Sequence, residues 1–172
     1  FKAALFMLVG IIDHQSKTRD LRKLDRLGAT WPVVAATAGV VAASMAGIPP
    51  LFGFLAKEEA LAALGETGFA WGVPVLIGVV LGSSFTVAYS ARFVWGAFGP
   101  RPVSTIPHQD SVRSEAVGQQ VPKPSKMFLA PVFVLAVLTL LFGLFPSLID
   151  PVIARAYASL AGVRAEHHLA LW

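Results

Sequence analysis

Two lysines in this sequence lie where a charge is costly. Lys57 follows residues 33–56, which contain no charged side chain, and Lys2 opens the apolar stretch FKAALFMLVG. On a helix, the neighbours of Lys2 at three and four residues are Leu5 and Phe6, which offer no charge partner. An ionised lysine at the centre of a membrane helix costs about 2.5–3.5 kcal/mol, and burial in general favours a neutral amine. Such a lysine can release and regain a proton, so we predict proton translocation through Lys2 and Lys57. The alternative is that both mark the water interface.

The stretch AGIPPLFGFLAKEEAL breaks a helix shortly before Lys57. Pro49 and Pro50 cannot donate to the carbonyls four residues earlier, and each proline disfavours helix in the residue before it. Gly53 adds backbone freedom, so the helix is expected to end near Gly47 and to leave unpaired carbonyls. Such backbone is tolerated at membrane depth only where it is buried in protein or faces a water-filled cavity. Broken helices place carbonyls and dipole ends around ion paths, and we predict that this break lines one.

Two further titratable side chains could support this chemistry. A carboxylate beside a lysine favours the charged lysine. Glu58, next to Lys57, would therefore give that lysine two accessible states, which a movable charge partner could switch. His14 lies beside Asp13 and could accept protons at a channel mouth. The alternative for His14 is an ordinary loop histidine.

Three hydroxyl side chains recur at helical spacing in residues 67–91. Ser83, Thr86 and Ser90 are separated by three and four residues, which places them on one helix face, and Tyr89 lies beside that face. A hydrated or ion-conducting face is one interpretation. The other is hydrogen bonding between helices, with Arg92 reaching out to the headgroups at the end of the span.

The composition indicates the elements that must position these residues. Hydrophobic residues make up 55% and charged residues 14% of the 172 residues, and the mean hydropathy is +0.67. Soluble domains are near a quarter charged. Residues 33–56, 67–91 and 127–149 contain no charge, and each run exceeds the roughly 20 residues that cross a hydrocarbon core about 30 Å thick. We therefore predict an all-α fold, a polytopic transmembrane helix bundle with one helix broken by Pro and Gly.

The chain divides into three parts. Residues 1–98 hold the core helices, residues 99–126 form a polar extramembrane loop, and residues 127–172 form a further transmembrane helix followed by an interfacial helix. Residues 1–12 are too short to cross, so we expect them to be the second half of a helix that begins outside this chain. Residues 13–28 are a solvated basic loop or a short amphipathic helix on the membrane surface. Thr30 is expected to cap the next helix, with Trp31 at the membrane interface.

Several classes of function are not supported by the sequence. The chain has no cysteine, so thiolate metal sites and cysteine nucleophiles are absent from it. The adjacent pair His167 and His168 cannot share a helix face, and we predict no metal site and no cofactor. The net charge of +4 indicates loop charge at lipid headgroups, not a nucleic-acid partner.

Two motifs resemble a known family. FKAALFMLVGIIDHQSKTRDLRKL, followed by SMAGIPPLFGFLAKEEAL, resembles the antiporter-like proteins. These comprise the large A-type subunit of multisubunit Mrp-type Na⁺/H⁺ antiporters and the largest antiporter-like subunit of respiratory complex I. The resemblance covers residues 1–98 well and continues loosely through YSARFVWGAFG. The stretches GFLAKEE, GIIDHQSKTRDLRKL and HHLALW look like the Mrp type.

The resemblance implies a function for the two lysines. Lys2 matches the lysine of the family's H-x-x-x-K-A motif, and Lys57 matches the lysine in the family's broken helix. The family's histidine and glutamate would lie before Phe1, so the chain would be the second half of one antiporter module. The implied protein is a membrane subunit of a multisubunit Na⁺ (or K⁺)/proton antiporter. It would be a transporter without a cofactor, multi-pass in the bacterial plasma membrane, with the other subunits as partners.

Two alternatives remain open. One is a proton-pumping subunit of complex I (NADH-quinone oxidoreductase) or of a related membrane-bound hydrogenase, which would co-purify with iron–sulfur and flavin subunits. The other is a membrane scaffold that does not transport ions, in which Lys57 would be labelled freely from bulk water.

Overall fold

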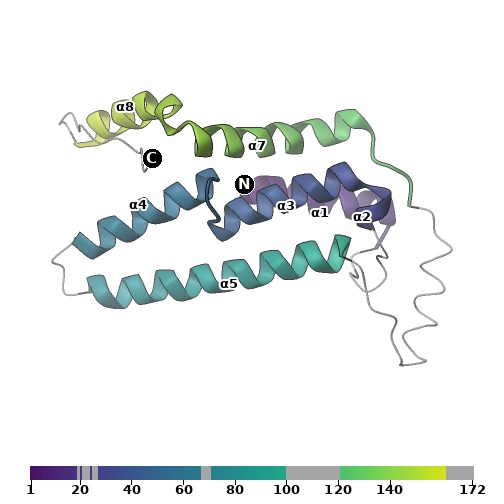
Figure 1. Cartoon of the computed structure of the whole chain (residues 1–172), viewed down its shortest axis with the longest axis horizontal. Helices are drawn as coiled ribbons and strands as arrows, with labels where there is room; N and C mark the ends of the chain where they lie inside the picture. The colour runs from purple at the N-terminus through teal and green to yellow at the C-terminus, as the bar shows by residue number, and fades with distance from the viewer. Residues whose placement is uncertain (19, 21–23, 25–26, 67–70, 100–120, 162–172) are drawn as a thin grey trace.

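In this computed structural model, residues 1–18, 20, 24, 27–66, 71–99 and 121–161 are described, and these residues form helices without any strand (Figure 1). The helices are α1 (Lys2–Ser16), α2 (Leu27–Thr30), α3 (Pro32–Ala46), α4 (Phe52–Glu66), α5 (Gly72–Phe98), α7 (Lys126–Leu144), the 3₁₀ turn η2 (Pro146–Leu148) and α8 (Asp150–Ala161). The prediction of an all-α bundle is confirmed.

The broken helix lies at the centre of the bundle. Helices α3 and α4 follow one another along the long axis, and α5 runs back beside both of them (Figure 1). Helix α7 also packs against both α3 and α4, while α1 packs against α3 and α7. The junction between α3 and α4 is therefore flanked by α5 and α7.

Small and branched side chains of α3 form much of the core. Ala38 and Val41 of α3 are completely buried, together with Ala4 and Leu8 of α1, and Val132 of α7 is 1% exposed. Small residues allow membrane helices to approach closely. Helix α3 therefore lies inside the bundle.

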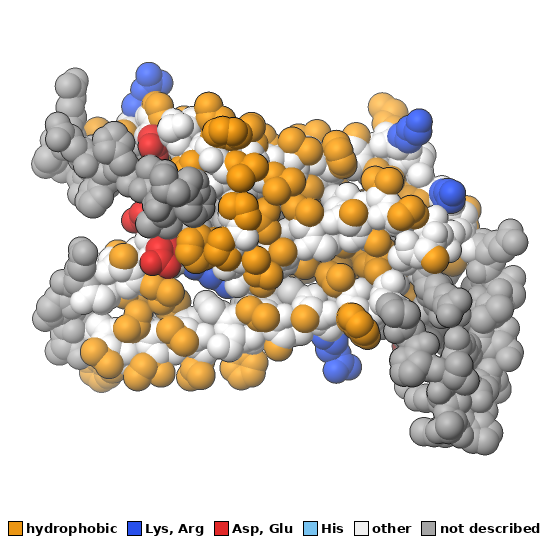
Figure 2. Space-filling model, in the orientation of Figure 1, with side chains coloured by type: hydrophobic (Ala, Val, Ile, Leu, Met, Phe, Trp, Pro, Cys, Tyr) orange, Lys and Arg blue, Asp and Glu red, His pale blue; other side chains and the backbone are white. Residues whose placement is uncertain are grey.

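Within the described residues, two helices are long and apolar enough to cross a membrane, namely α5 with 27 residues and α7 with 19. The charge-free run 33–56 is not one helix, because α3 ends after 15 residues and the run continues into α4. Apolar side chains cover much of the outer surface (Figure 2), including Phe85 at 72% and Met127 at 89% exposed. Apolar surface of this extent requires lipid or other protein around it.

The connection between α1 and α3 differs from the prediction. Helix α1 continues through Ser16, so the predicted loop does not start at Asp13. Leu24 and Leu27 are 3% and 2% exposed within the core, so they pack against the bundle and not on a membrane surface. Leu21, the other leucine of the repeat, lies outside the described part of the chain.

The start of α3 also corrects two predictions. Thr30 ends α2 and does not cap α3, whose N-cap residue is Trp31 without a side-chain hydrogen bond. Trp31 is 2% exposed, so its ring is in the core and not at the membrane interface. The indole packs within the hydrophobic core, and its Nε1 is buried without a hydrogen-bond partner among the described residues.

The described C-terminal part consists of α7, η2 and α8. Ser125 caps α7 through its Oγ, which accepts from the Phe128 N–H at 3.3 Å. A helix begins at Asp150, as predicted, although its interfacial position stays a prediction. Residues 100–120, most of the predicted polar loop, and the pair His167 and His168 lie outside the described residues.

Candidate functional site: the helix break and the two lysine clefts

Helix α3 ends in a regular C-terminal motif at the predicted position. Gly47 adopts φ 84° and ψ 42°, and its N–H donates to the carbonyls of Ser44 and Ala43, both at 3.1 Å. The Ile48 N–H donates to the Ala43 carbonyl at 3.0 Å. A left-handed glycine with this pair of bonds is the Schellman motif. The sequence predicted unpaired carbonyls at this helix end. The carbonyls of Ala43 and Ser44 instead accept hydrogen bonds from backbone N–H groups.

Lys57 supplies a donor that the double proline removes. Its Nζ donates to the Ala46 carbonyl at 2.9 Å. In an uninterrupted helix this carbonyl would accept from residue 50, but Pro50 has no N–H. The ammonium also lies at the negative end of the α3 dipole, where a cation is stabilised. The sequence predicted a carbonyl without a backbone donor and a lysine near it. In the structure, this lysine donates a hydrogen bond to this carbonyl.

Gly47 makes room for this lysine. A Cβ at Gly47 would lie 2.8 Å from Lys57 Cδ and 3.4 Å from its Nζ. Glycine is therefore required here for two reasons. It adopts the left-handed backbone without strain, and its lack of a Cβ leaves space for the Lys57 side chain.

We expect Gly47→Ala to weaken this arrangement. Alanine in the left-handed region costs about 1–2 kcal/mol, and its methyl group displaces Lys57. The midpoint of thermal unfolding of the purified complex should fall. Gly39→Ala is the matched control in the same helix, because a Cβ there meets nothing within 4 Å. Equal midpoints for the two variants would contradict the role assigned to Gly47.

Lys57 lies in a cleft of about 270 Å³ between the end of α3, α4 and α5. Glu58 lines it from α4, and Ser83 and Ser84 line it from α5. Ser84 donates to the Val80 carbonyl of its own helix at 3.1 Å. The cleft thus brings Lys57, Glu58 and Ser83, three of the residues singled out from the sequence, to one place.

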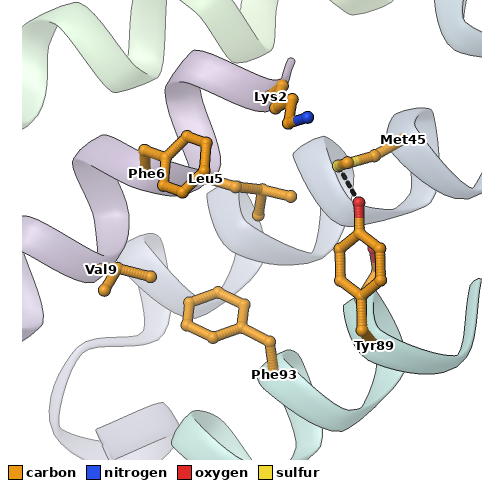
Figure 3. A pocket seen from close by; sticks show the side chains of 8 residues that line it. Lys2, Leu5, Phe6, Val9, Met45, Tyr89 and Phe93 are labelled. Carbon is orange, nitrogen blue, oxygen red and sulfur yellow. Dashed lines mark hydrogen bonds between the residues drawn. The ribbon is translucent and has the colours of Figure 1, made fainter. Parts of the chain in front are cut away.

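Lys2 lies in a second, larger cleft of about 420 Å³ between α1, α3 and α5 (Figure 3). Its exposed side chain points from α1 toward Met45 of α3. On the facing side, the Tyr89 hydroxyl donates to Met45 Sδ at 3.4 Å. Ser90 is 2% exposed, and its Oγ has no hydrogen-bond partner within the described structure. A buried hydroxyl without a partner is one that a water molecule in this cleft could satisfy.

The two clefts follow one another along α3 and α5. Met45 lines the Lys2 cleft and the next residue, Ala46, lines the Lys57 cleft. On α5, Tyr89 and Ser90 belong to the first cleft and Ser83 to the second. Ser83, Thr86 and Ser90 are all less exposed than Phe85 and Tyr89, and the hydrated face that their spacing suggests stays a prediction. Thr86 donates to the Gly82 carbonyl at 2.8 Å.

His14 does not join either cleft. It lies twelve residues beyond Lys2 on α1, about 18 Å away at 1.5 Å per residue. Its ring meets Phe128 edge to face, with the ring centroids 5.5 Å apart. A role at a channel mouth stays a prediction.

Metal binding finds no support in the described ranges. No group of three His, Cys, Asp or Glu side chains in those ranges could hold a metal ion.

Sequence reasoning passed over two residues at this site. Met45 lines the Lys2 cleft and its Sδ accepts from the Tyr89 hydroxyl. Ser44 Oγ accepts from the Gly53 N–H at 3.2 Å, so that α3 caps the first turn of α4. The sequence feature that could have indicated Ser44 is its position three residues before Gly47, within one helical turn of the break, in the stretch ASMAG. That stretch indicated only a small-residue helix.

Comparison with known proteins places this geometry in a family. Residues 1–86, half of the chain, match the family described as "NADH:quinone oxidoreductase/Mrp antiporter, TM". The chain belongs to this family. The match covers both lysines and the break between α3 and α4, and it ends inside α5.

Individual members of the antiporter family extend the likeness over the whole chain. The A1 subunit of a Na(+)/H(+) antiporter of Staphylococcus haemolyticus (strain JCSC1435) is 36% identical over 98% of the chain and 21% of its own length. The A/B subunit of a probable K(+)/H(+) antiporter of Rhizobium meliloti (strain 1021) is 35% identical over 100% of the chain and 16% of its own length. The chain spans about a fifth of the length of these curated relatives.

A solved structure of the antiporter family has the same fold. A chain in the structure of the Mrp complex from Dietzia sp. DQ12-45-1b superposes with a TM-score of 0.74 at 37% identity, over 99% of this chain and 17% of that one. The resemblance to the A-type subunit of Mrp antiporters that the two motifs indicated is confirmed, and the family is a membrane family.

Proposed function

We propose that this chain is part of the membrane subunit of a multisubunit monovalent cation/proton antiporter, and that Lys2 and Lys57 carry protons in it. The observation that carries the proposal is the bond from Lys57 Nζ to the Ala46 carbonyl at the helix break. A protonated Lys57 is attracted to the negative end of α3. A neutral amine loses this attraction and is free to turn from the Ala46 carbonyl toward Glu58 and Ser83, which line the same cleft. Lys57 thus has two positions that depend on its proton.

The Lys2 cleft adds the second proton site. Met45 lines the Lys2 cleft and Ala46 lines the Lys57 cleft, so the proposed route between the two lysines passes the contact of Tyr89 with Met45. Thr86, which stands between Ser83 and Ser90 on the same face of α5, is proposed to support this route.

The cations, partners and location follow from the relatives. Their names include Na(+)/H(+) and K(+)/H(+) antiporters, so the proposed cation is Na⁺ or K⁺. The proposed partners are the other subunits of the complex and the lipid bilayer. The proposed location is multi-pass in the bacterial plasma membrane, and no cofactor is proposed for the chain.

A second candidate is a proton-pumping subunit of an NADH:quinone oxidoreductase, because the family description includes that enzyme. This candidate differs from the antiporter in the energy source that drives proton movement. Proton movement would then require an electron donor and would not respond to a cation gradient alone.

Substitution of Lys2 tests the proposal. In everted membrane vesicles that contain the intact complex, addition of Na⁺ or K⁺ should release protons from the acidified lumen, and a fluorescent pH indicator records this. We expect Lys2→Ala to reduce the response to background, because alanine carries no proton.

The matched control is Lys126→Ala, which removes an exposed lysine at the start of α7. It should respond as the unaltered complex does. A full response in Lys2→Ala would overturn the role of Lys2. Proton movement that appears only with NADH would favour the second candidate.

A further inference from the structure

Helix α7 lies outside the part of the chain that matches the family description, yet it contacts the break directly. Thr139 of α7 is 4% exposed, and its Oγ1 lies 2.6 Å from Ser44 Oγ of α3, which is completely buried. Either hydroxyl can donate to the other. A buried hydroxyl needs such a partner, since none is offered by the apolar side chains around it.

The Ser44 oxygen connects α7 to α4 as well. It accepts from the Gly53 N–H at 3.2 Å, and Gly53 lies in the first turn of α4. N–H groups in the first turn of a helix have no acceptor within the helix. The hydroxyl of Thr139 therefore fixes the acceptor that holds the beginning of α4 against the end of α3.

A second contact of α7 lies one turn further along. Gly143 is on the same face of α7 as Thr139, four residues away. A Cβ on Gly143 would meet the Pro50 carbonyl oxygen, the Phe52 N–H and Leu51 backbone atoms. The rings of Phe52 and Phe142 pack edge to face beside it, with the centroids 6.0 Å apart. The backbone of α7 therefore lies directly against residues 50–52, which form the break itself.

The break in turn positions Lys57. Lys57 follows Gly53 by four residues, about one helical turn, so the direction in which α4 leaves the break sets where the Lys57 side chain points. In the structure it points to the Ala46 carbonyl, 2.9 Å away.

We propose that Thr139 is a positioning residue for Lys57, acting through Ser44 and the first turn of α4. The proposal depends on the proposed function only for its effect on transport, because the position of α4 can be measured without transport. Thr139 touches no ion in this mechanism, and its hydroxyl determines where Lys57 lies.

The test compares Thr139→Val with Thr139→Ser in the intact complex. Valine keeps the shape of threonine and removes the hydroxyl, whereas serine keeps the hydroxyl. We expect Thr139→Val to lower cation-driven proton movement several-fold and to shift its pH profile at an unchanged amount of complex. Thr139→Ser should restore both. Thr37→Val is the matched control, because Thr37 donates only to the Val33 carbonyl of its own helix at 2.8 Å.

A labelling measurement reports position without transport. Leu61 of α4 lines the Lys57 cleft, and Leu61→Cys introduces the single thiol of this chain. Labelling of the complex without this substitution is subtracted as background. Its rate of reaction with a water-soluble maleimide should change when Thr139→Val is added and return with Thr139→Ser.

The outcomes separate the two proposals. An unchanged labelling rate together with an unchanged pH profile would overturn the role of Thr139. A changed labelling rate without an effect on proton movement would support the positioning of α4 by Thr139 and would contradict the role of Lys57 in transport. If Thr139→Val lowers the amount of complex, the labelling rate of the remaining complex decides whether Thr139 positions α4.

Discussion

Replacing Lys57 by arginine is expected to abolish cation-driven proton movement even though the charge is kept. Arginine can still donate to the Ala46 carbonyl and still places a cation at the end of α3, where Lys57 now donates at 2.9 Å. The guanidinium does not release its proton in proteins. A residue that only stabilises the helix end would tolerate arginine, whereas a proton carrier would not. Lys57→Arg therefore separates the two roles that the geometry gives this lysine.

The measurement is cation-driven proton release from everted vesicles, compared at equal amounts of intact complex on a native gel. Lys57→Gln is the companion variant, because it removes both the charge and the titratable proton and should be equally inactive. Lys126→Arg, at the exposed start of α7, is the matched control and should retain the full response. Retained transport in Lys57→Arg would show that the charge alone matters and would contradict proton transfer through this residue.

The position of the break could be predicted because its causes are local. Pro49 and Pro50 cannot donate to the carbonyls four residues earlier, and each disfavours helix in the residue before it. Gly47 is the nearest residue that adopts a left-handed backbone without strain. The bond from Lys57 to Ala46 could not be predicted from spacing alone. It requires α4 to turn back toward the end of α3, and that direction depends on packing against α5 and α7.

The polar face of α5 could also be predicted from the sequence. That its residues line two different clefts could not. Spacing of three and four residues places Ser83 and Ser90 on one face of any helix. That Ser83 lines the Lys57 cleft and Ser90 the Lys2 cleft depends on where Met45 meets Tyr89 across the bundle. Lys2 was expected to have no charge partner on its own helix, and the α1 residues that line its cleft, Leu5, Phe6 and Val9, are all apolar.

The contact between Ser44 and Thr139 was beyond sequence reasoning altogether. The two residues are 95 positions apart, and Thr139 is a single hydroxyl within an apolar helix, where threonine commonly bonds to its own backbone. Only the packing of α7 against the break shows that this hydroxyl has a partner on another helix. Long-range hydrogen bonds of this kind carry no period or local motif that a single sequence could reveal.

Gly53→Ala is expected to push the first turn of α4 away from the end of α3. A Cβ at this position would collide with the carbonyl oxygen of Ser44 and lie 3.0 Å from its Oγ. The backbone carbonyl belongs to α3 and cannot rotate away as a side chain could. The first turn of α4 would have to move, which breaks the bond from the Gly53 N–H to Ser44 Oγ and carries Lys57 away from Ala46. Overpacking of this kind costs about 1–3 kcal/mol, and the lost hydrogen bond adds about 1 kcal/mol.

The amount and the thermal stability of the intact complex measure this effect, and both should fall together with transport. Gly65→Ala is the matched control in the same helix, because a Cβ at Gly65 meets nothing within 4 Å. Alanine favours a helix interior over glycine by about 1 kcal/mol, so this control should be neutral or slightly stabilising. If Gly53→Ala assembled and transported as Gly65→Ala does, α3 and α4 could not be in contact as described, and the position of Lys57 would have to depend on other residues.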